Sequence, residues 1–378
     1  MYNLIQLPED PLFATLKEFR ADSNPQKINL GVGFLGDENG RAFVFDSIKK
    51  AAQKINFENF NYLPIQGDKK FLEHTVKFFL GKNFDDWDKI AYQQTCGGTQ
   101  GISLFNQFAI RANLKKLIIG TPTWVNHFGL LKNLEIIKVP HLDENEKINL
   151  VGYKQELEKI EKNSILFLQG GGAHNPIGKN FSISQLEELL DLIIEKNLFV
   201  FVDCAYFGLG NNKDEDQKFC KWLFDKIPNL AFSVSFSKNA SLYKHRTGVF
   251  FMKTKEKNIV QSHLQNIIRI DISNPPSFGS EIMNIVFENF YENWLQELEN
   301  IRQNLNLRRK KLCEELGSKF LSIKDGKGLF GLLPISENQV NLLKKKFSIY
   351  LPKSGRINFG GVPINKINFL AEKITEIL

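Results

Sequence analysis

The feature that most constrains the fold is a series of short apolar runs that alternate with helical patterns through the middle of the chain. Each run is rich in Val, Ile, Leu, Phe or Ala. The runs cover residues 117–119, 136–139, 165–168, 199–202, 231–234 and 249–251. Nearly continuous apolar runs of this kind are typical of strands buried on both faces of a mainly parallel sheet.

Helical spacing of apolar residues lies between these runs. One helix is expected to begin at about Thr99. Another follows Ser182, and Ser184, three residues before Glu187, predicts a capping box at its start. Strands that alternate with helices over some 150 residues predict an α/β fold with a doubly wound sheet.

The pattern changes after about Ser277. A single long helical stretch over 282–312 precedes a glycine-punctuated strand region, a helix near Glu337–Phe347, a strand at 356–359 and a final helix. We expect a smaller α+β domain here, because a chain of 378 residues seldom folds around one core.

Composition excludes several classes of protein. Apolar residues make up 42% and charged residues 24%, which is ordinary globular usage and argues against disorder. No apolar run approaches the ~20 residues that span a bilayer. The first ten residues lack the basic start and apolar stretch of a signal peptide. We therefore expect a cytoplasmic protein with no membrane partner.

The net charge of +7 does not predict a nucleic-acid partner, because no recognition motif accompanies it. Basic clusters at 308–311 and 344–346 occur in helical stretches, where we expect solvated faces. The cysteines are far apart and are expected to be reduced, mostly buried thiols; they are Cys96, Cys204, Cys220 and Cys313. No metal-ligand spacing is present, so we expect no metal.

Polar segments follow several of the predicted strands, where ligands bind in open α/β sheets. Residues 96–101 form a glycine-rich turn that opens a helix. Its backbone N–H groups could hold a phosphate, or its glycines could simply permit close packing. Residues 170–179 do not form a P-loop, because five residues separate Gly172 from Gly178 and Asn180 replaces the hydroxyl residue.

Two charged residues stand at the ends of expected strands. Asp203 ends an apolar run, and Lys238 follows a segment in which Ser alternates with apolar residues. A lysine after a strand is usually a surface residue. Here the strand is expected to be central, where an unpaired ammonium group would be costly.

With these segments the sequence resembles the fold-type I aminotransferases, in the aspartate and aromatic amino-acid aminotransferase branch. The resemblance runs from residues 10–11 and 27–33 to 354–358. Its most specific parts are 235–238, with Arg246 eight residues later, and 273–276. It implies a pyridoxal-phosphate transferase.

The resemblance also implies two domains. A large domain with a mostly parallel, doubly wound sheet would span residues 36–295. A smaller α+β domain would combine residues 1–35, which include an N-terminal arm, with residues 296–378.

The resemblance implies catalytic roles in which pyridoxal phosphate is the cofactor. Lys238 would form the Schiff base and shuttle the α-proton, and Asp203 would pair with the pyridinium nitrogen. Tyr206 and Asn175 would donate hydrogen bonds to the ring oxygen. His127 would lie behind Asp203 and orient it.

The resemblance further implies binding roles. The cofactor phosphate would be held by Gly98, Thr99, Ser235 and Arg246, together with Tyr62 of a neighbouring subunit. Trp124 would stack on the ring. Arg356, near Gly33 and Asn175, would bind the α-carboxylate, and Arg269 from the neighbouring subunit would bind a side-chain carboxylate. Judged by residue type alone, Trp124 and Tyr62 are core aromatics, and the two arginines are ion-paired surface residues.

The implied function is an aspartate-type aminotransferase that converts L-aspartate and 2-oxoglutarate to oxaloacetate and L-glutamate by a ping-pong mechanism. We expect a homodimer with shared sites. An aromatic amino-acid aminotransferase is the main alternative, and Phe34, in the segment after Gly33, favours it. A pyridoxal-phosphate-dependent lyase or decarboxylase would normally lack Arg269. Lys238 and Asp203 argue against a non-catalytic role.

Overall fold

The computed structural model describes residues 4–7, 9–37, 41–56, 58 and 61–378. Residues 1–3 and 8 of the N-terminal stretch considered above lie outside this set. The chain forms two compact units: unit 1 contains Met1–Phe43, Pro176–Gly178 and Asn304–Leu378, and unit 2 contains Val44–Asn175 and Lys179–Gln303. The domain boundaries expected from the sequence stay a prediction.

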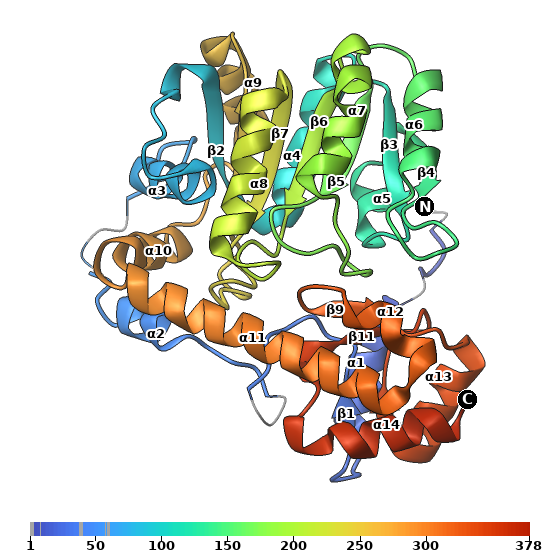
Figure 1. Cartoon of the computed structure of the whole chain (residues 1–378). Coiled ribbons are helices and arrows are strands. Elements are labelled where there is room, and N and C mark those ends of the chain that lie inside the picture. The colour runs from blue at the N-terminus through green and yellow to red at the C-terminus, as the bar shows by residue number, and fades with distance from the viewer. Residues whose placement is uncertain (1–3, 8, 38–40, 57, 59–60) are drawn as a thin grey trace. The chain divides into compact units, whose positions relative to one another are not determined.

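The centre of unit 2 is a sheet to which the described residues contribute seven strands (Figure 1). The strands are β2 (Ile90–Cys96), β3 (Lys116–Thr121), β4 (Glu135–Pro140), β5 (Ile165–Gln169), β6 (Phe199–Cys204), β7 (Asn229–Ser235) and β8 (Thr247–Lys253). Their order is β2-β8-β7-β6-β5-β3-β4. Strand β8 is antiparallel to both of its neighbours, and the other pairs are parallel. All six predicted runs are strands of this sheet.

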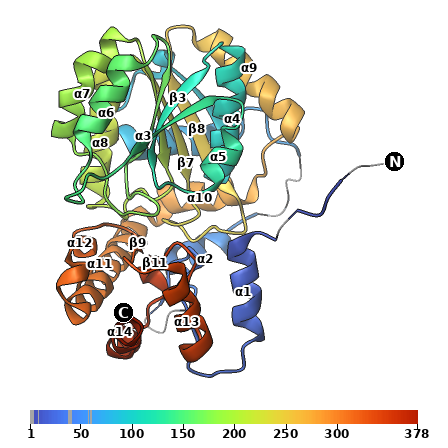
Figure 2. The same cartoon turned by 90° about the vertical axis from the view of Figure 1, so that its right-hand side faces the viewer.

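Helices cover both faces of this sheet, which confirms the doubly wound α/β fold (Figure 2). One face carries α4 (Gly97–Arg111), α5 (Asn126–Leu130) and α9 (Lys257–Asp271). The other carries α3 (Lys69–Leu80), α6 (Leu150–Lys159), α7 (Ile183–Glu195) and α8 (Lys213–Lys226). The unit also contains α2 (Asp46–Ala52), η1 (Trp87–Lys89) and α10 (Phe278–Asn289).

Aromatic packing fixes α4 on the sheet. The ring of Phe105 in α4 stacks on that of Phe201 in β6, with 4.0 Å between centroids and 10° between planes. Phe201 also meets Phe167 of β5 edge-on at 5.4 Å. Because all three side chains are almost fully buried, this contact holds the middle of α4 against β6 and β5.

Two sequence-based helix boundaries are wrong in detail. The capping box of α7 uses Ser182 and Gln185, because Ser182 is extended and its hydroxyl accepts the Gln185 N–H, whereas Ser184 is already helical. The long stretch expected over 282–312 divides at Phe290 into α10 and α11 (Tyr291–Leu316).

Unit 1 has the α+β character expected from the sequence. Its elements, besides the end of α11, are α1 (Pro11–Ala21), β1 (Ile28–Asn29), η2 (Ser318–Phe320), α12 (Leu321–Lys324), β9 (Phe330–Leu332), α13 (Glu337–Phe347), β10 (Ile349–Tyr350), β11 (Arg356–Asn358), η3 (Phe359–Gly361), η4 (Ile364–Lys366) and α14 (Ile367–Glu376). Strand β1 pairs with β10 in parallel, and β11 pairs with β9 antiparallel.

Three of the four cysteines are buried, Cys96 is half-buried, and all four thiols are free, as the sequence predicts. Among the described residues, no helix combines the length and the apolar character that a bilayer crossing requires.

The basic cluster at 308–311 is not the solvated face that the sequence predicts. Arg308 and Arg309 are only 2% and 1% exposed. Arg308 donates to the carbonyl oxygens of Gly36, Asp37 and Gly360. The prediction fails because successive residues of a helix are rotated by 100° and so face different surroundings. Lys310 and Lys311 on the same helix are exposed.

Arg309 joins the loop between α12 and β9 to α11. Its guanidinium donates to the carbonyl oxygens of residues 323, 327, 328 and 330, and lies 4.1 Å from the centroid of the Phe359 ring. Burial lowers the pKa of Arg309 to about 9. Carbonyl oxygens only accept, so they are matched by a guanidinium, which has only donors and is the form present at neutral pH.

We predict that Arg309→Met destabilises the protein by about 3 kcal/mol, because buried carbonyl oxygens lose a charged donor. Lys310→Met is the matched control, since it removes the same charge from an exposed neighbour. The measurement is thermal unfolding of the two variants and the wild type. Equal melting temperatures for the two variants would contradict the prediction.

Candidate active site

Three polar residues lie side by side where β5, β6 and β7 end. Gln169 pairs in register with Asp203, and Asp203 pairs with Ser233. Register partners on adjacent strands project from the same face of a sheet. The hydroxyl of Ser233 donates to the carbonyl oxygen of Gly98 at 2.9 Å, so this is the face that α4 covers.

Asp203 is a buried carboxylate held by a buried imidazole. The side chain is 6% exposed, and its Oδ2 lies 3.1 Å from Nε2 of His127, which is 0% exposed. The Nδ1 of His127 lies 2.7 Å from the hydroxyl of Thr123. The Trp124 ring meets the His127 ring edge-on at 5.3 Å. A carboxylate in this setting suits a ligand with a protonated ring nitrogen.

The glycines at the start of α4 permit close packing against β7, which is one of the two roles that the sequence left open. A Cβ at Gly98 would lie 3.3 Å from Cβ of Ser235, and one at Gly101 would lie 2.3 Å from Oγ of Ser233, so close packing requires both glycines. Gly97 has φ +72°, and a Cβ there would lie 3.0 Å from Nη2 of Arg246. Glycine at 97 therefore leaves room between the helix start and a guanidinium group.

Arg246 brings positive charge to this helix start. Its Nη2 donates to the carbonyl oxygen of Cys96 at 3.4 Å, and its Nη1 donates to the hydroxyl of Ser237 and to the carbonyl oxygen of Tyr243. The side chain of Gln100 steadies the turn by accepting the Cys96 N–H at 2.7 Å. A helix N-terminus beside an arginine is suited to bind a phosphate.

Three other predicted residues lie in unit 2. The amide of Asn175 donates to the hydroxyl of Tyr206 at 3.3 Å, and both side chains are buried. Lys238 is half-buried, and its ammonium group lies 5.2 Å from the centroid of the Tyr243 ring.

Arg356 and Gly33 belong to unit 1, where both contact Phe330. Arg356 donates to the carbonyl oxygen of Gly31 at 2.9 Å, and its guanidinium carbon lies 4.4 Å from the centroid of the Phe330 ring. A Cβ at Gly33 would come within 2.7 Å of the same ring. Sequence reasoning missed Phe330, because an aromatic residue in a short strand reads as core.

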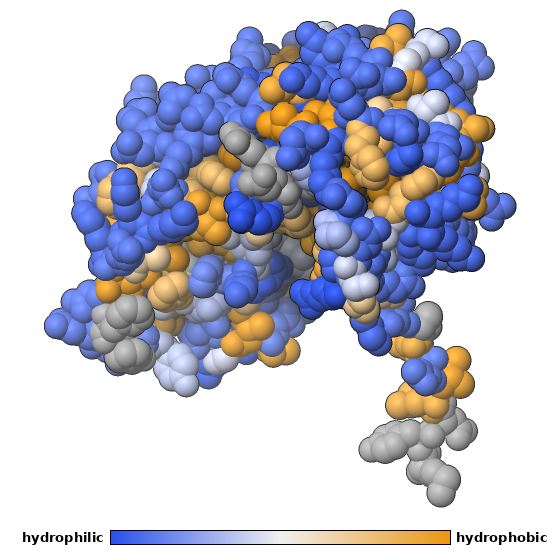
Figure 3. All heavy atoms as spheres, turned by 90° about the horizontal axis from the view of Figure 1, so that it is seen from below, coloured by the Kyte–Doolittle hydropathy of each residue, from blue (hydrophilic) through white to orange (hydrophobic). Residues whose placement is uncertain are grey.

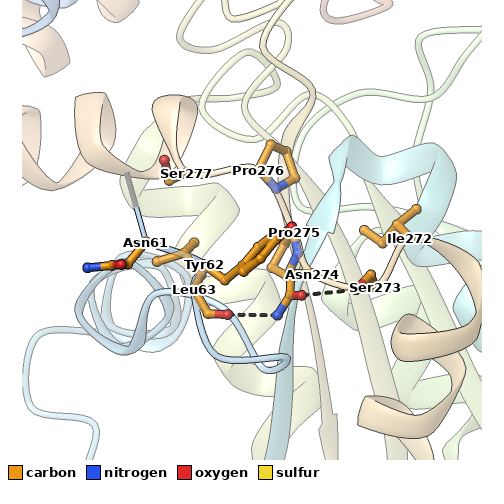
Figure 4. A pocket seen from close by; sticks show the side chains of 9 residues that line it. All are labelled: Asn61, Tyr62, Leu63, Ile272, Ser273, Asn274, Pro275, Pro276 and Ser277. Atoms are coloured by element: carbon orange, nitrogen blue, oxygen red, sulfur yellow. Dashed lines mark hydrogen bonds between the residues drawn. The ribbon is translucent and has the colours of Figure 1, made fainter. Parts of the chain in front are cut away.

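Tyr62 and Arg269 are both linked to one surface pocket of about 470 Å³, shown in Figure 4. Residues 61–63 and 272–277 line it. The amide of Asn274 donates to the carbonyl oxygen of Leu63 at 2.7 Å and accepts from the hydroxyl of Ser273, which in turn accepts from Arg269 at 2.6 Å. Tyr62 is 90% exposed, so it is not the core aromatic that residue type alone suggests.

Comparisons with known proteins agree along the whole chain. A family model for aminotransferase class I and II matches residues 25–374. A tyrosine aminotransferase from Rhizobium meliloti (strain 1021) is 30% identical over 387 residues, which cover 99% of this chain and 99% of that protein.

Two solved structures are similar to this chain. An aromatic-amino-acid aminotransferase from Burkholderia pseudomallei, covalently bound to pyridoxal phosphate, has 27% identity and a TM-score of 0.94, covering 100% of this chain and 98% of that one. An aspartate aminotransferase from Saccharomyces cerevisiae cytoplasm has 27% identity and a TM-score of 0.93, covering 99% and 97%.

The residues of unit 2 fit the chemistry of pyridoxal phosphate. The start of α4 beside Arg246 offers an anion site, with space that a Cβ at Gly97 would fill. The buried carboxylate of Asp203 suits the protonated ring nitrogen.

We predict that Gly97→Ala weakens binding of pyridoxal phosphate about ten-fold or more, because a side chain at φ +72° is strained and displaces Arg246. Gly129→Ala is the control, since Gly129 is an exposed helical glycine whose Cβ would meet nothing within 4 Å. The measurement is cofactor titration of the two apoproteins. Equal affinities would show that Gly97 serves packing alone.

Proposed function

This chain belongs to the aminotransferase class I and II family and is a pyridoxal-phosphate-dependent aspartate or aromatic amino-acid aminotransferase, and we propose that its preferred reaction is transfer of the amino group of L-aspartate to 2-oxoglutarate. The observation that carries this choice is the guanidinium of Arg269, held by Ser273 beside a surface pocket with polar walls. Such a cation suits a second substrate carboxylate.

Bound pyridoxal phosphate supplies the electron sink that lets the α-proton of an amino acid leave. We propose that Lys238 carries the cofactor covalently and moves this proton with its amine. Asp203, held by His127, keeps the ring nitrogen protonated. Asn175 and Tyr206, which are joined by a hydrogen bond, both donate hydrogen bonds to the ring oxygen.

The cofactor phosphate is proposed to bind at the start of α4. Gly98 and Thr99 lie in the first turn, where backbone N–H groups point out of the helix. Ser235 packs against Gly98, and Arg246 supplies a charged donor. Trp124, whose ring meets that of His127, is proposed to stack on the cofactor ring.

Arg356 is proposed to bind the α-carboxylate of the substrate, next to the backbone of Gly33. The ring of Phe330 and the carbonyl oxygen of Gly31 hold its guanidinium in place. Unit 2 is then the large cofactor-binding domain and unit 1 the small domain with the N-terminal arm.

The aromatic alternative is favoured by Phe34 and by the names of two similar proteins, a tyrosine and an aromatic-amino-acid aminotransferase. An apolar residue after Gly33 could cover a substrate ring. An aromatic substrate would, however, leave the guanidinium of Arg269 without a carboxylate. Membership of the aminotransferase family argues against the lyase and decarboxylase alternatives.

We predict that aspartate and glutamate are used with higher kcat/KM than phenylalanine and tyrosine. Arg269→Leu should lower kcat/KM for aspartate about ten- to a hundredfold, because a hydrogen bond to a charged group is lost, while phenylalanine is little affected. Arg111→Leu, which removes an exposed arginine from α4, is the control. Tyrosine or phenylalanine outpacing aspartate in the wild type would establish the aromatic function.

We propose that the active unit is a homodimer in which Tyr62 and Arg269 serve the neighbour's site. Both lie at one exposed pocket of unit 2. The N-terminal segment also carries exposed apolar side chains, including Leu4 and Ile5, and Figure 3 shows orange atoms among blue ones along this projecting segment. Exposed apolar surface of this kind marks protein–protein contact.

By analogy with the yeast enzyme, the proposed location is the cytoplasm.

We predict that two inactive or weakened variants restore each other. Lys238→Ala alone should abolish transamination, and Arg269→Leu alone should lose most aspartate activity. After equal mixing and re-association, one intact site per heterodimer should restore about a quarter of wild-type activity. Sedimentation should show a dimer. A fully active monomer, or a mixture no better than its parents, would contradict shared sites.

A further inference from the structure

A buried polar side chain at the end of β5 has no part in the roles proposed so far. Gln169 is 7% exposed. Its Oε1 accepts the backbone N–H of Asn175 at 2.9 Å, and its Nε2 lies 3.0 Å from the carbonyl oxygen of the same residue. The same nitrogen lies 3.0 Å from the hydroxyl of Thr123 and 3.2 Å from Nε2 of His174.

The contacts fix which way the amide of Gln169 points. A backbone N–H can only donate, so the atom that faces the Asn175 nitrogen is the amide oxygen. The amide nitrogen therefore faces Thr123 and the Asn175 carbonyl oxygen. An amide nitrogen can only donate, so the hydroxyl of Thr123 accepts from it.

The direction of the hydrogen bond from Gln169 to Thr123 influences which ring nitrogen of His127 carries the proton. The hydroxyl of Thr123 has one proton, and its other partner is Nδ1 of His127 at 2.7 Å. When that proton points to Nδ1, a neutral imidazole carries its own proton on Nε2. Nε2 lies 3.1 Å from Oδ2 of Asp203, so the carboxylate accepts a hydrogen bond from this N–H.

The second neighbour of the amide is the buried imidazole of His174. Burial, together with the nearby rings of His141 and His127, lowers the pKa of His174 well below its usual value. Nε2 of His174 can then accept from Gln169 without adding charge to the network.

We propose that Gln169 is a positioning residue of the reaction: its amide holds the backbone of Asn175 and, through Thr123, places the proton of His127 on Nε2, facing Asp203. One side chain thereby organises the group that faces the ring oxygen and the group that faces the ring nitrogen. This inference rests on the proposed roles of Asn175 and Asp203, and it is independent of the preferred substrate.

The first experiment observes the imidazole directly. Holoenzyme labelled with ¹⁵N-histidine is compared by NMR in the wild type, Gln169→Glu, Thr123→Val and Thr123→Ser, with His127→Asn to assign the signal. We expect the His127 proton at Nε2, with Nδ1 as the acceptor, in the wild type and in Thr123→Ser. In Gln169→Glu the new carboxylate only accepts, so the Thr123 proton turns to it and His127 gains a proton at Nδ1. Thr123→Val removes the donor to Nδ1 and should shift that signal.

The second experiment measures the bound cofactor without substrate. The pH titration of its visible absorbance should move to higher pH by about 0.5–1 unit in Gln169→Leu, because Asn175 loses its anchor and stabilises the ionised ring oxygen less well. Gln93→Leu is the matched control. It removes another buried glutamine of the same unit, whose amide nitrogen donates to the carbonyl oxygens of Ile65, Gln66 and Gln94.

The experiments distinguish a failure of the proposed role of Asn175 from a failure of the proposed role of Gln169. If Asn175→Ala leaves the titration unchanged, the proposed role of Asn175 is wrong. If Asn175→Ala moves it while Gln169→Leu, like Gln93→Leu, only lowers the melting temperature, Gln169 is a structural residue. An unchanged His127 spectrum in Gln169→Glu would likewise overturn the inference.

Discussion

The buried carboxylate at the end of β6 is the constraint on which the rest of unit 2 depends. Taking an ionised group out of water is costly unless hydrogen bonds or an opposite charge replace the lost solvation. Asp203 is 6% exposed, and the imidazole of His127 meets one of its oxygens. Its register partners, Gln169 and Ser233, are also polar and buried. The carboxylate thus determines the character of three adjacent strand ends.

The close approach of α4 follows from the same arrangement. A Cβ at Gly98 would lie 3.9 Å from Oδ1 of Asp203, so the positive end of the helix dipole faces the carboxylate. Glycines at 97, 98 and 101 make this approach sterically possible, and the stacked rings of α4 and β6 hold it. The helix start and Arg246 together form a polar surface suited to an anion, whereas the neighbouring carboxylate is suited to a cationic group.

Local patterns predicted much of this structure, and the misses share one cause. The six apolar runs became strands, because burial on both faces leaves a continuous local signal. Strand β2 was missed, since Gln93 and Gln94 look exposed in sequence although both are buried. Arg309 was expected in solvent, yet four carbonyl oxygens surround it. Gln169 carried no sequence signal. In each case at least one partner is distant in the chain: Gln93 contacts Ile65, Arg309 contacts Phe330, and Gln169 contacts Thr123.

The sequence by itself determined the layered α/β fold and the family, because strand runs and motif spacings are properties of short segments. The tertiary structure alone decided how polar atoms pair. Thr123 and Gln169 are 46 residues apart, and His127 and Asp203 are 76 apart. Whether their atoms come within 3 Å depends on which strand ends are adjacent and which face α4 covers. Residue order does not encode that geometry until the sheet has formed.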